Sequence, residues 1–165
     1  MRMSLKERIE ALPAGAFCND EIRISPIRDD YDLWYATVEC CLAPGQEELV
    51  NPAGFSIGRA YLHPEDHVPC IIWLGTCRIG YIVLRKWSDS SATSWSYYLD
   101  TQHQGKGFGR SAARLAVQIL KSAAPDQPIK LSTEKDNVKA QRLYCSIGFR
   151  LSPEMDGDDL VFVYE

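Results

Sequence analysis

The chain has 165 residues, of which 45% are hydrophobic and 24% charged, and this length and composition are typical of one soluble globular domain. A net charge of −4 excludes the strongly basic character of many nucleic-acid-binding proteins. The sequence also lacks a run of 18 apolar residues, which a membrane-spanning helix would need. Residues 1–12 are charged and lack the apolar core of a secretory signal, so we expect a cytoplasmic protein with neither nucleic acid nor membrane as its partner.

The six cysteines form no Cys-x-x-Cys pair and no zinc-ligand spacing with the three histidines, so we expect no metal site. Cys40 and Cys41 are adjacent, which is unfavourable for a disulfide framework. We therefore expect reduced and mostly buried thiols.

The N-terminal part predicts an extension followed by a strand. Residues 1–20 form a short amphipathic segment that we expect to be peripheral, which leaves residues 21–165 as the single domain. Within Glu21–Pro26, Ile22 and Ile24 alternate with polar residues, a pattern typical of a strand.

Two helical regions are predicted next. Asp29 or Asp30 offers an N-cap for the first helix. Its apolar positions are Leu33, Trp34, Thr37, Val38, Cys41 and Leu42. The second region covers Gln46–Leu62 and is interrupted near Asn51-Pro52.

Three strands follow in the middle of the chain. Cys70–Leu74 and Ile79–Leu84 are apolar and β-branched, and the short turn between them predicts a hairpin. Thr93–Asp100 alternates between two kinds of side chain, which predicts a strand with two distinct faces. Tyr97 and Tyr98 should therefore point to opposite faces of the sheet.

A glycine-rich turn, Gln104–Gly109, lies between that strand and a predicted helix, Arg110–Ala124. Such a turn suits an anion, because the first N–H groups of a helix lack partners and the helix dipole adds positive character. The spacing fits neither a P-loop, since no Ser or Thr follows Lys106, nor the dinucleotide fingerprint. This segment alone also allows a tight turn with no ligand.

The C-terminal part predicts one strand, one helix and two further strands. Ile129–Thr133 is the strand, and Asp136 or Asn137 caps the helix. That helix carries Ala140, Leu143, Tyr144 and Ile147 on one side. Phe149–Leu151 and Leu160–Tyr164 close the chain, which gives the order β-α-α-β-β-β-α-β-α-β-β, a single mixed α/β domain.

Two motifs in this order resemble those of the GCN5-related N-acetyltransferases (the GNAT family). Gln104, Gly107 and Gly109 fill the family's pyrophosphate motif. The later motif is filled by Asn137, Ala140, Tyr144, Gly148 and Phe149. The resemblance implies the acyl-CoA N-acyltransferase fold, acetyl-CoA as co-substrate, and direct transfer to an amine without a covalent enzyme intermediate.

The resemblance also implies roles for individual residues. The implied cofactor-binding residues are Tyr98, Leu99, Asp100, Gln104, Gly105, Lys106, Gly107, Phe108, Gly109, Arg110 and Asn137. Tyr144 occupies the position of the acid that protonates the departing thiolate. Solvated charge is the alternative for Lys106 and a core tyrosine for Tyr144, whereas for Asn137 a contact with the cofactor and a helix cap are compatible roles.

The acceptor is less defined by the sequence than the donor. Asn51–Glu65 resembles bacterial diamine and polyamine acetyltransferases, which favours a small-molecule amine such as a polyamine or diamine. A protein N-terminal or lysine acetyltransferase and a non-enzymatic acyl-CoA-binding module remain open, and a homodimer is expected only by analogy with the family. The candidates for the general base are Glu39, Glu47, Glu48, Glu65 and Glu134.

Overall fold

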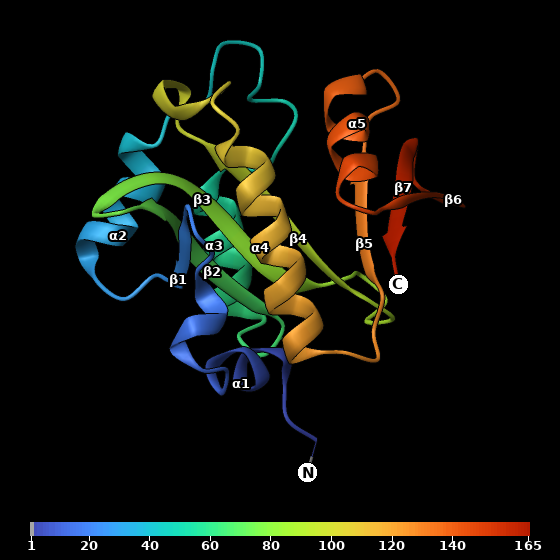
Figure 1. Ribbon diagram of the computed structural model, residues 1–165, viewed down its shortest axis with the longest axis horizontal. Helices are drawn as coiled ribbons and strands as arrows, with labels where there is room; N and C mark the ends of the chain where they lie inside the picture. The colour runs from blue at the N-terminus through green and yellow to red at the C-terminus, as the bar shows by residue number, and fades with distance from the viewer. Residues whose placement is uncertain (1) are drawn as a thin grey trace.

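A computed structural model of the chain describes residues 2–165, which form one seven-stranded sheet with the order β1-β2-β3-β4-β5-β7-β6 (Figure 1). The strands are β1 (Arg23–Pro26), β2 (His67–Leu74), β3 (Cys77–Lys86), β4 (Thr93–Leu99), β5 (Ile129–Thr133), β6 (Arg150–Asp156) and β7 (Asp159–Tyr164). All neighbouring strands are antiparallel except β4 and β5, which are parallel. The prediction of a mixed α/β fold is confirmed.

The helices cover both faces of this sheet. They are α1 (Leu5–Glu10), η1 (Ala14–Phe17), α2 (Asp30–Trp34), η2 (Tyr35–Glu39), α3 (Ala53–Leu62), η3 (Thr101–His103), α4 (Phe108–Ala123) and α5 (Val138–Ser146). In Figure 1, α4 crosses the front of the sheet, while α3 lies behind it. The predicted element order is thus observed, with α1 added at its start.

Strand alternation divides the core into two layers. On β3, Ile82 and Leu84 face the cluster that includes the apolar side of α4, whereas Tyr81 and Val83 face the cluster of η2 and α3. Both clusters consist of side chains that are almost completely excluded from water, and their burial stabilises the fold. On β4, Tyr97 packs against the first cluster and Tyr98 against the second, as the alternation predicts.

The N-terminal segment contributes to this core. Ser4 caps α1 in a reciprocal capping box with Glu7, and Leu5 and Ile9 are fully buried beside α4. The expectation of a peripheral segment is therefore wrong for α1, because two of its apolar side chains complete the layer around α4. The division of the chain into residues 1–20 and 21–165 stays a prediction.

The first predicted helix has the expected start and the wrong buried face. Asp29 caps α2, but Tyr35 and Ala36 are buried, while Trp34 and Val38 are 57% and 51% exposed. The cause is the π-helical turn η2, in which the N–H of Cys40 bonds to the carbonyl of Tyr35, because this wider turn rotates the side chains relative to a regular α-helix.

The second predicted helical region is shorter than expected. Only Ala53–Leu62 is helical, and the residues before it form a loop. We call residues 42–52 the covering loop, because they lie over the site described below. Proline at position 52 suits a helix start, since Pro has no N–H to donate.

The expectation of mostly buried thiols is wrong. All six cysteines are free, and four of them are exposed: Cys18, Cys41, Cys77 and Cys145. Cys70 is buried and Cys40 is half-buried. These exposed cysteines lie in irregular segments (Cys18 and Cys41), at the first residue of β3 (Cys77) and on α5 (Cys145), where periodicity carries little information on burial.

Candidate active site

A large cleft opens between β4 and β5. The two strands are paired only at Thr93 and Ile129, and beyond this point they separate, as Figure 1 shows. The space between them has a volume of about 990 Å³. Parallel strands that separate in this way leave backbone N–H and C=O groups of β4 free to pair with a ligand in extended conformation.

The glycine turn forms one end of the large cleft. Gly105 and Gly107 have φ values of 74° and 87°, which L side chains rarely adopt, and Gly107 is the N-cap of α4. Within residues 2–165, no acceptor takes the N–H groups of Gly105, Lys106 and Gly107. These donors, together with the first turn of α4, form a seat for an anion.

Gly109 lets α4 approach β4 closely. A Cβ at this position would lie 3.3 Å from the hydroxyl oxygen of Tyr97, and that hydroxyl donates a hydrogen bond to the Gly109 carbonyl at 3.1 Å. The absence of a side chain therefore fixes the start of α4 against the strand that lines the cleft.

The side chain of Gln104 connects the end of β4 to the covering loop by hydrogen bonds. Its Nε2 donates to the Leu99 carbonyl at 2.9 Å and to Gln46 Oε1 at 2.9 Å, and Gln46 Nε2 donates back to Gln104 Oε1 at 3.2 Å. Gln104 thus ties the covering loop to the end of β4. Sequence alone pointed to a cofactor role but had no signal for this partner.

Some predicted cofactor residues line the large cleft and others do not. Those that line it are Tyr98, Leu99, Gln104, Gly105, Gly107, Gly109, Arg110 and Asn137, whereas Asp100, Lys106 and Phe108 are not among its lining residues. The Asp100 carboxylate accepts the N–H groups of Cys41 and Gln102, both at 3.0 Å, and Phe108 packs against the core. The cofactor-binding assignment of each residue stays a prediction.

Tyr144 lies on α5 at the cleft, with its ring packed against Phe149 and Phe162. Burial raises the pKa of Tyr144 to about 12, so the phenol stays protonated at neutral pH. Within residues 2–165 its hydroxyl has no hydrogen-bond partner, so it is available to a ligand. Asn137 Oδ1 accepts the N–H of Ala140 at 3.2 Å and so caps α5.

Three of the five proposed base candidates lie at the large cleft. Glu47, Glu48 and Glu134 line it, and Glu39 and Glu65 do not. Asp159, at the start of β7, is a fourth carboxylate in the lining that sequence reasoning missed. It lies at the β6–β7 hairpin, and its place at the cleft depends on the pairing of β7 with β5, which is part of the tertiary fold.

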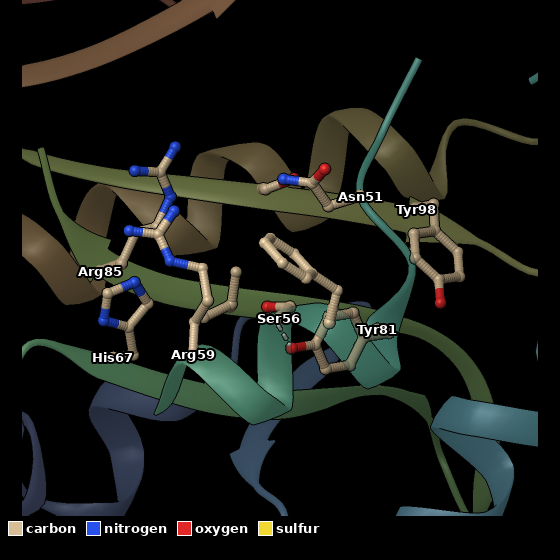
Figure 2. A pocket seen from close by; sticks show the side chains of 10 residues that line it. Asn51, Ser56, Arg59, His67, Tyr81, Arg85 and Tyr98 are labelled. Carbon is tan, nitrogen blue, oxygen red and sulfur yellow. Dashed lines mark hydrogen bonds between the residues drawn. The ribbon is translucent and has the colours of Figure 1, made fainter. Parts of the chain in front are cut away.

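A small cavity of about 70 Å³ lies on the α3 side of the sheet. Its lining comes from the covering loop, α3, β2, β3 and β4: Asn51, Phe55, Ser56, Arg59, His67, Tyr81, Val83, Arg85, Ser96 and Tyr98. Within this lining the Tyr81 hydroxyl donates to Ser56 Oγ at 2.7 Å, shown dashed in Figure 2. Asn51, Arg85, Ser96 and Tyr98 also line the large cleft, so the two spaces adjoin.

Residues 2–165 contain no group of three or more His, Cys, Asp or Glu side chains placed to hold a metal ion. Among the same residues, no helix is long and apolar enough to cross a bilayer.

The chain is similar in sequence and in fold to known acetyltransferases. A spermine/spermidine N(1)-acetyltransferase of Bacillus subtilis is 33% identical over 60 residues, which are 36% of this chain and only 40% of that protein. An acetyltransferase from Agrobacterium tumefaciens has a TM-score of 0.68 at 19% identity, over 90% of this chain and 92% of its own.

Two further solved structures contain CoA. An aminoglycoside acetyltransferase in complex with coenzyme A has a TM-score of 0.68 at 20% identity, over 87% of this chain and 94% of its own. A spermidine N-acetyltransferase from Vibrio cholerae in complex with CoA and spermine has a TM-score of 0.66 at 17% identity, over 88% of this chain and 94% of its own. At these identities the likeness establishes the fold.

The family assignment comes from a match over most of the sequence. The model of the acetyltransferase (GNAT) family matches residues 30–149, which extend from α2 through the glycine turn to Phe149 and include Tyr144. The chain therefore belongs to the GNAT family of acetyltransferases.

Proposed function

We propose that the protein transfers the acetyl group of acetyl-CoA directly to the primary amine of a small molecule. Membership in the family makes it an N-acetyltransferase with acetyl-CoA as donor. The observation that supports the rest of the proposal is the large cleft, which joins the glycine turn, Tyr144 and the small cavity in one adjoining space.

Each part of the large cleft has a role in this reaction. The free N–H groups at Gly105–Gly107 and the start of α4 bind the pyrophosphate, and the unpaired edge of β4 binds the pantetheine arm. A neutral amine attacks the thioester carbon, so that the C–N bond forms as the C–S bond breaks. The departing sulfur takes a proton from the Tyr144 hydroxyl, and the phenolate regains a proton from solvent, since a pKa of about 12 favours its protonated form.

The amine must lose its proton before it attacks, because an alkylamine has a pKa of about 10.4. Glu47, Glu48 and Glu134 line the cleft and are the carboxylates that we propose as candidates for this base. Replacing each with Gln in turn tests the choice: the base variant loses kcat at neutral pH and recovers part of it as the pH rises. A set of three variants with unchanged pH profiles would contradict the proposal.

The covering loop favours a small acceptor over a peptide. Residues 46–52 all line the large cleft, and the paired amides of Gln46 and Gln104 hold this loop against β4. A peptide needs an open groove through which its chain can pass, and the loop narrows that path. The partial likeness to a spermine/spermidine acetyltransferase supports a polyamine or diamine acceptor.

The experiment is a screen of amines and peptides with acetyl-CoA, in which free thiol is followed and products are identified by mass. Turnover of small amines with a higher kcat/KM than any peptide is the expected result. Faster reaction with peptide N-termini or lysines would indicate a protein acetyltransferase instead. Binding of acetyl-CoA without transfer to any acceptor would indicate an acyl-CoA-binding module.

A further inference from the structure

We propose that the small cavity binds an anionic group of the acceptor, a carboxylate or a phosphate, and that the acceptor is therefore an amine that carries such a group. This inference rests on the proposed function and names the acceptor class for the same site. It departs from the polyamine expectation, since a polyamine would bring a second positive charge to this place.

Positive charge collects at one side of the small cavity. Arg59 on α3 and Arg85 on β3 both line it, and Figure 2 shows them beside His67. Neither arginine is within 4.0 Å of a carboxylate in residues 2–165, and the lining of the small cavity in these residues contains no Asp or Glu. Two guanidinium groups without a carboxylate partner suit a bidentate oxyanion.

The protonation of the side chains beside the small cavity is consistent with an anionic ligand. Burial, and after it the charge of Arg59, lowers the pKa of Arg85, while Asp156 acts in the opposite direction. Burial and the charges of Arg59 and Arg85 lower the pKa of His67, so this imidazole is neutral at neutral pH. The charge of the small cavity at neutral pH thus comes from its two arginines.

His67 also carries an unpartnered polar atom. The residue is only 8% exposed, and its Nδ1 is buried with no hydrogen-bond partner in residues 2–165. A buried polar atom without a partner costs free energy. This atom is too enclosed to contact an occupant of the small cavity, so the anionic preference comes from the two arginines.

The side chain of Arg85 begins at the end of the sheet opposite the glycine turn, away from the pyrophosphate seat. The β3–β4 register pairs Arg85 with Ser94, whereas the turn follows Leu99 at the other end of β4. Five residues of extended strand span about 17 Å. The small cavity therefore has an anion-binding role separate from that of the glycine turn.

The two adjoining spaces offer different groups to an acceptor that has both an amine and an anionic group. The lining of the large cleft, where the amine reacts, contains carboxylates together with Arg110, Lys139 and Arg142, whereas the small cavity is lined by arginines and by no carboxylate among the described residues. Ser96 and Tyr98 on β4 lie in both linings and connect the two sites. An amine bound across them places its anionic end against Arg59 and Arg85.

The test compares four acceptors of one chain length: an ω-amino carboxylate, an ω-aminoalkyl phosphate, the amino alcohol and the diamine. We expect the carboxylate or the phosphate to have the highest kcat/KM and the diamine the lowest, and the order of the first two tells which oxyanion is preferred. A diamine that reacts as well as both anionic acceptors would overturn the inference.

Two variants and one control connect this preference to the small cavity. Arg85→Gln should raise KM for the preferred anionic acceptor by roughly ten- to a hundredfold, the range expected for lost hydrogen bonds to a charged group. Because Arg85 also borders the large cleft, KM for acetyl-CoA is measured beside it and should change much less. Arg59→Gln alters an exposed residue, so it should fold normally and shift the same parameter. Arg150→Gln, an exposed arginine outside both sites, should change neither value.

Direct binding separates failure of this inference from failure of the proposed function. If no amine is acetylated, the proposed function fails, and calorimetry of the ω-amino carboxylate and the ω-aminoalkyl phosphate with the CoA-saturated protein decides the inference. Weaker binding of both by Arg59→Gln and Arg85→Gln than by Arg150→Gln would support it. Equal binding by all three variants, or no binding by the unmodified protein, would overturn it.

Discussion

Replacing Tyr144 with Phe removes one hydroxyl and keeps the aromatic ring. The ring centroid lies 6.0 Å from that of Phe149 and 5.7 Å from that of Phe162, and these contacts remain in the variant. The hydroxyl has no partner within residues 2–165, so its removal leaves no protein group unpaired. We therefore expect the free energy of unfolding to change by less than about 0.5 kcal/mol.

The effect on the rate should be much larger. General acids contribute about 10²–10⁴-fold. A thiol has a pKa of about 8.5 and leaves more easily than an alcohol, so the lower end of this range applies. A loss of about a hundredfold in kcat corresponds to about 2.7 kcal/mol of activation free energy.

The assay measures kcat and KM for acetyl-CoA by thiol release, and unfolding by denaturant titration. KM for acetyl-CoA should stay within about twofold, since the hydroxyl acts on the departing sulfur and not on the bound ground state. Tyr164→Phe is the matched control, because its ring packs against Phe149 at 5.4 Å but does not line the large cleft. A Tyr144→Phe variant whose kcat equals that of Tyr164→Phe would refute the acid role.

Three further predictions follow from the described geometry. Gly107→Val should abolish acetyl-CoA binding in calorimetry. Gly75→Val also replaces a glycine of positive φ, but in the β2–β3 turn outside both sites, and should keep it; equal loss in both variants would indicate general strain. Ile9→Ala should lower the free energy of unfolding by about 2–5 kcal/mol, because the Ile9 side chain is fully buried. Denaturant titration measures this change, and an unchanged free energy would show that α1 does not stabilise the domain. Burial raises the pKa of Tyr98 and Tyr144 to about 12 from an unfolded value of about 10. Their contribution to the free energy of unfolding is therefore complete below pH 10 and is lost as the pH rises towards 12. Ultraviolet titration should show both phenols ionising at a higher pH in native than in urea-unfolded protein, and coincident titration curves would contradict this.

The sequence by itself determined the parts of this protein that depend on local physics. Alternation along Thr93–Leu99 predicted β4 and its two faces, and the glycines before Phe108 predicted a turn at a helix start. The Asn137 cap and the order of the elements depend on neighbouring residues in the same way. Together they were sufficient to indicate the fold and the donor, because the motif that surrounds a pyrophosphate is contained in one short segment.

Only the tertiary structure decided which surfaces meet. Leu5 and Ile9 are buried because α4 passes beside them, and the π-helical turn selects Tyr35 over Trp34 for the interior. The small cavity draws its lining from the covering loop, one helix and three strands, and Arg59 and Arg85 are 26 positions apart in the sequence. The hydrophobic pattern within one segment does not indicate which distant residues will contact it. Those contacts depend on the order of the strands in the sheet and on the helices packed against it.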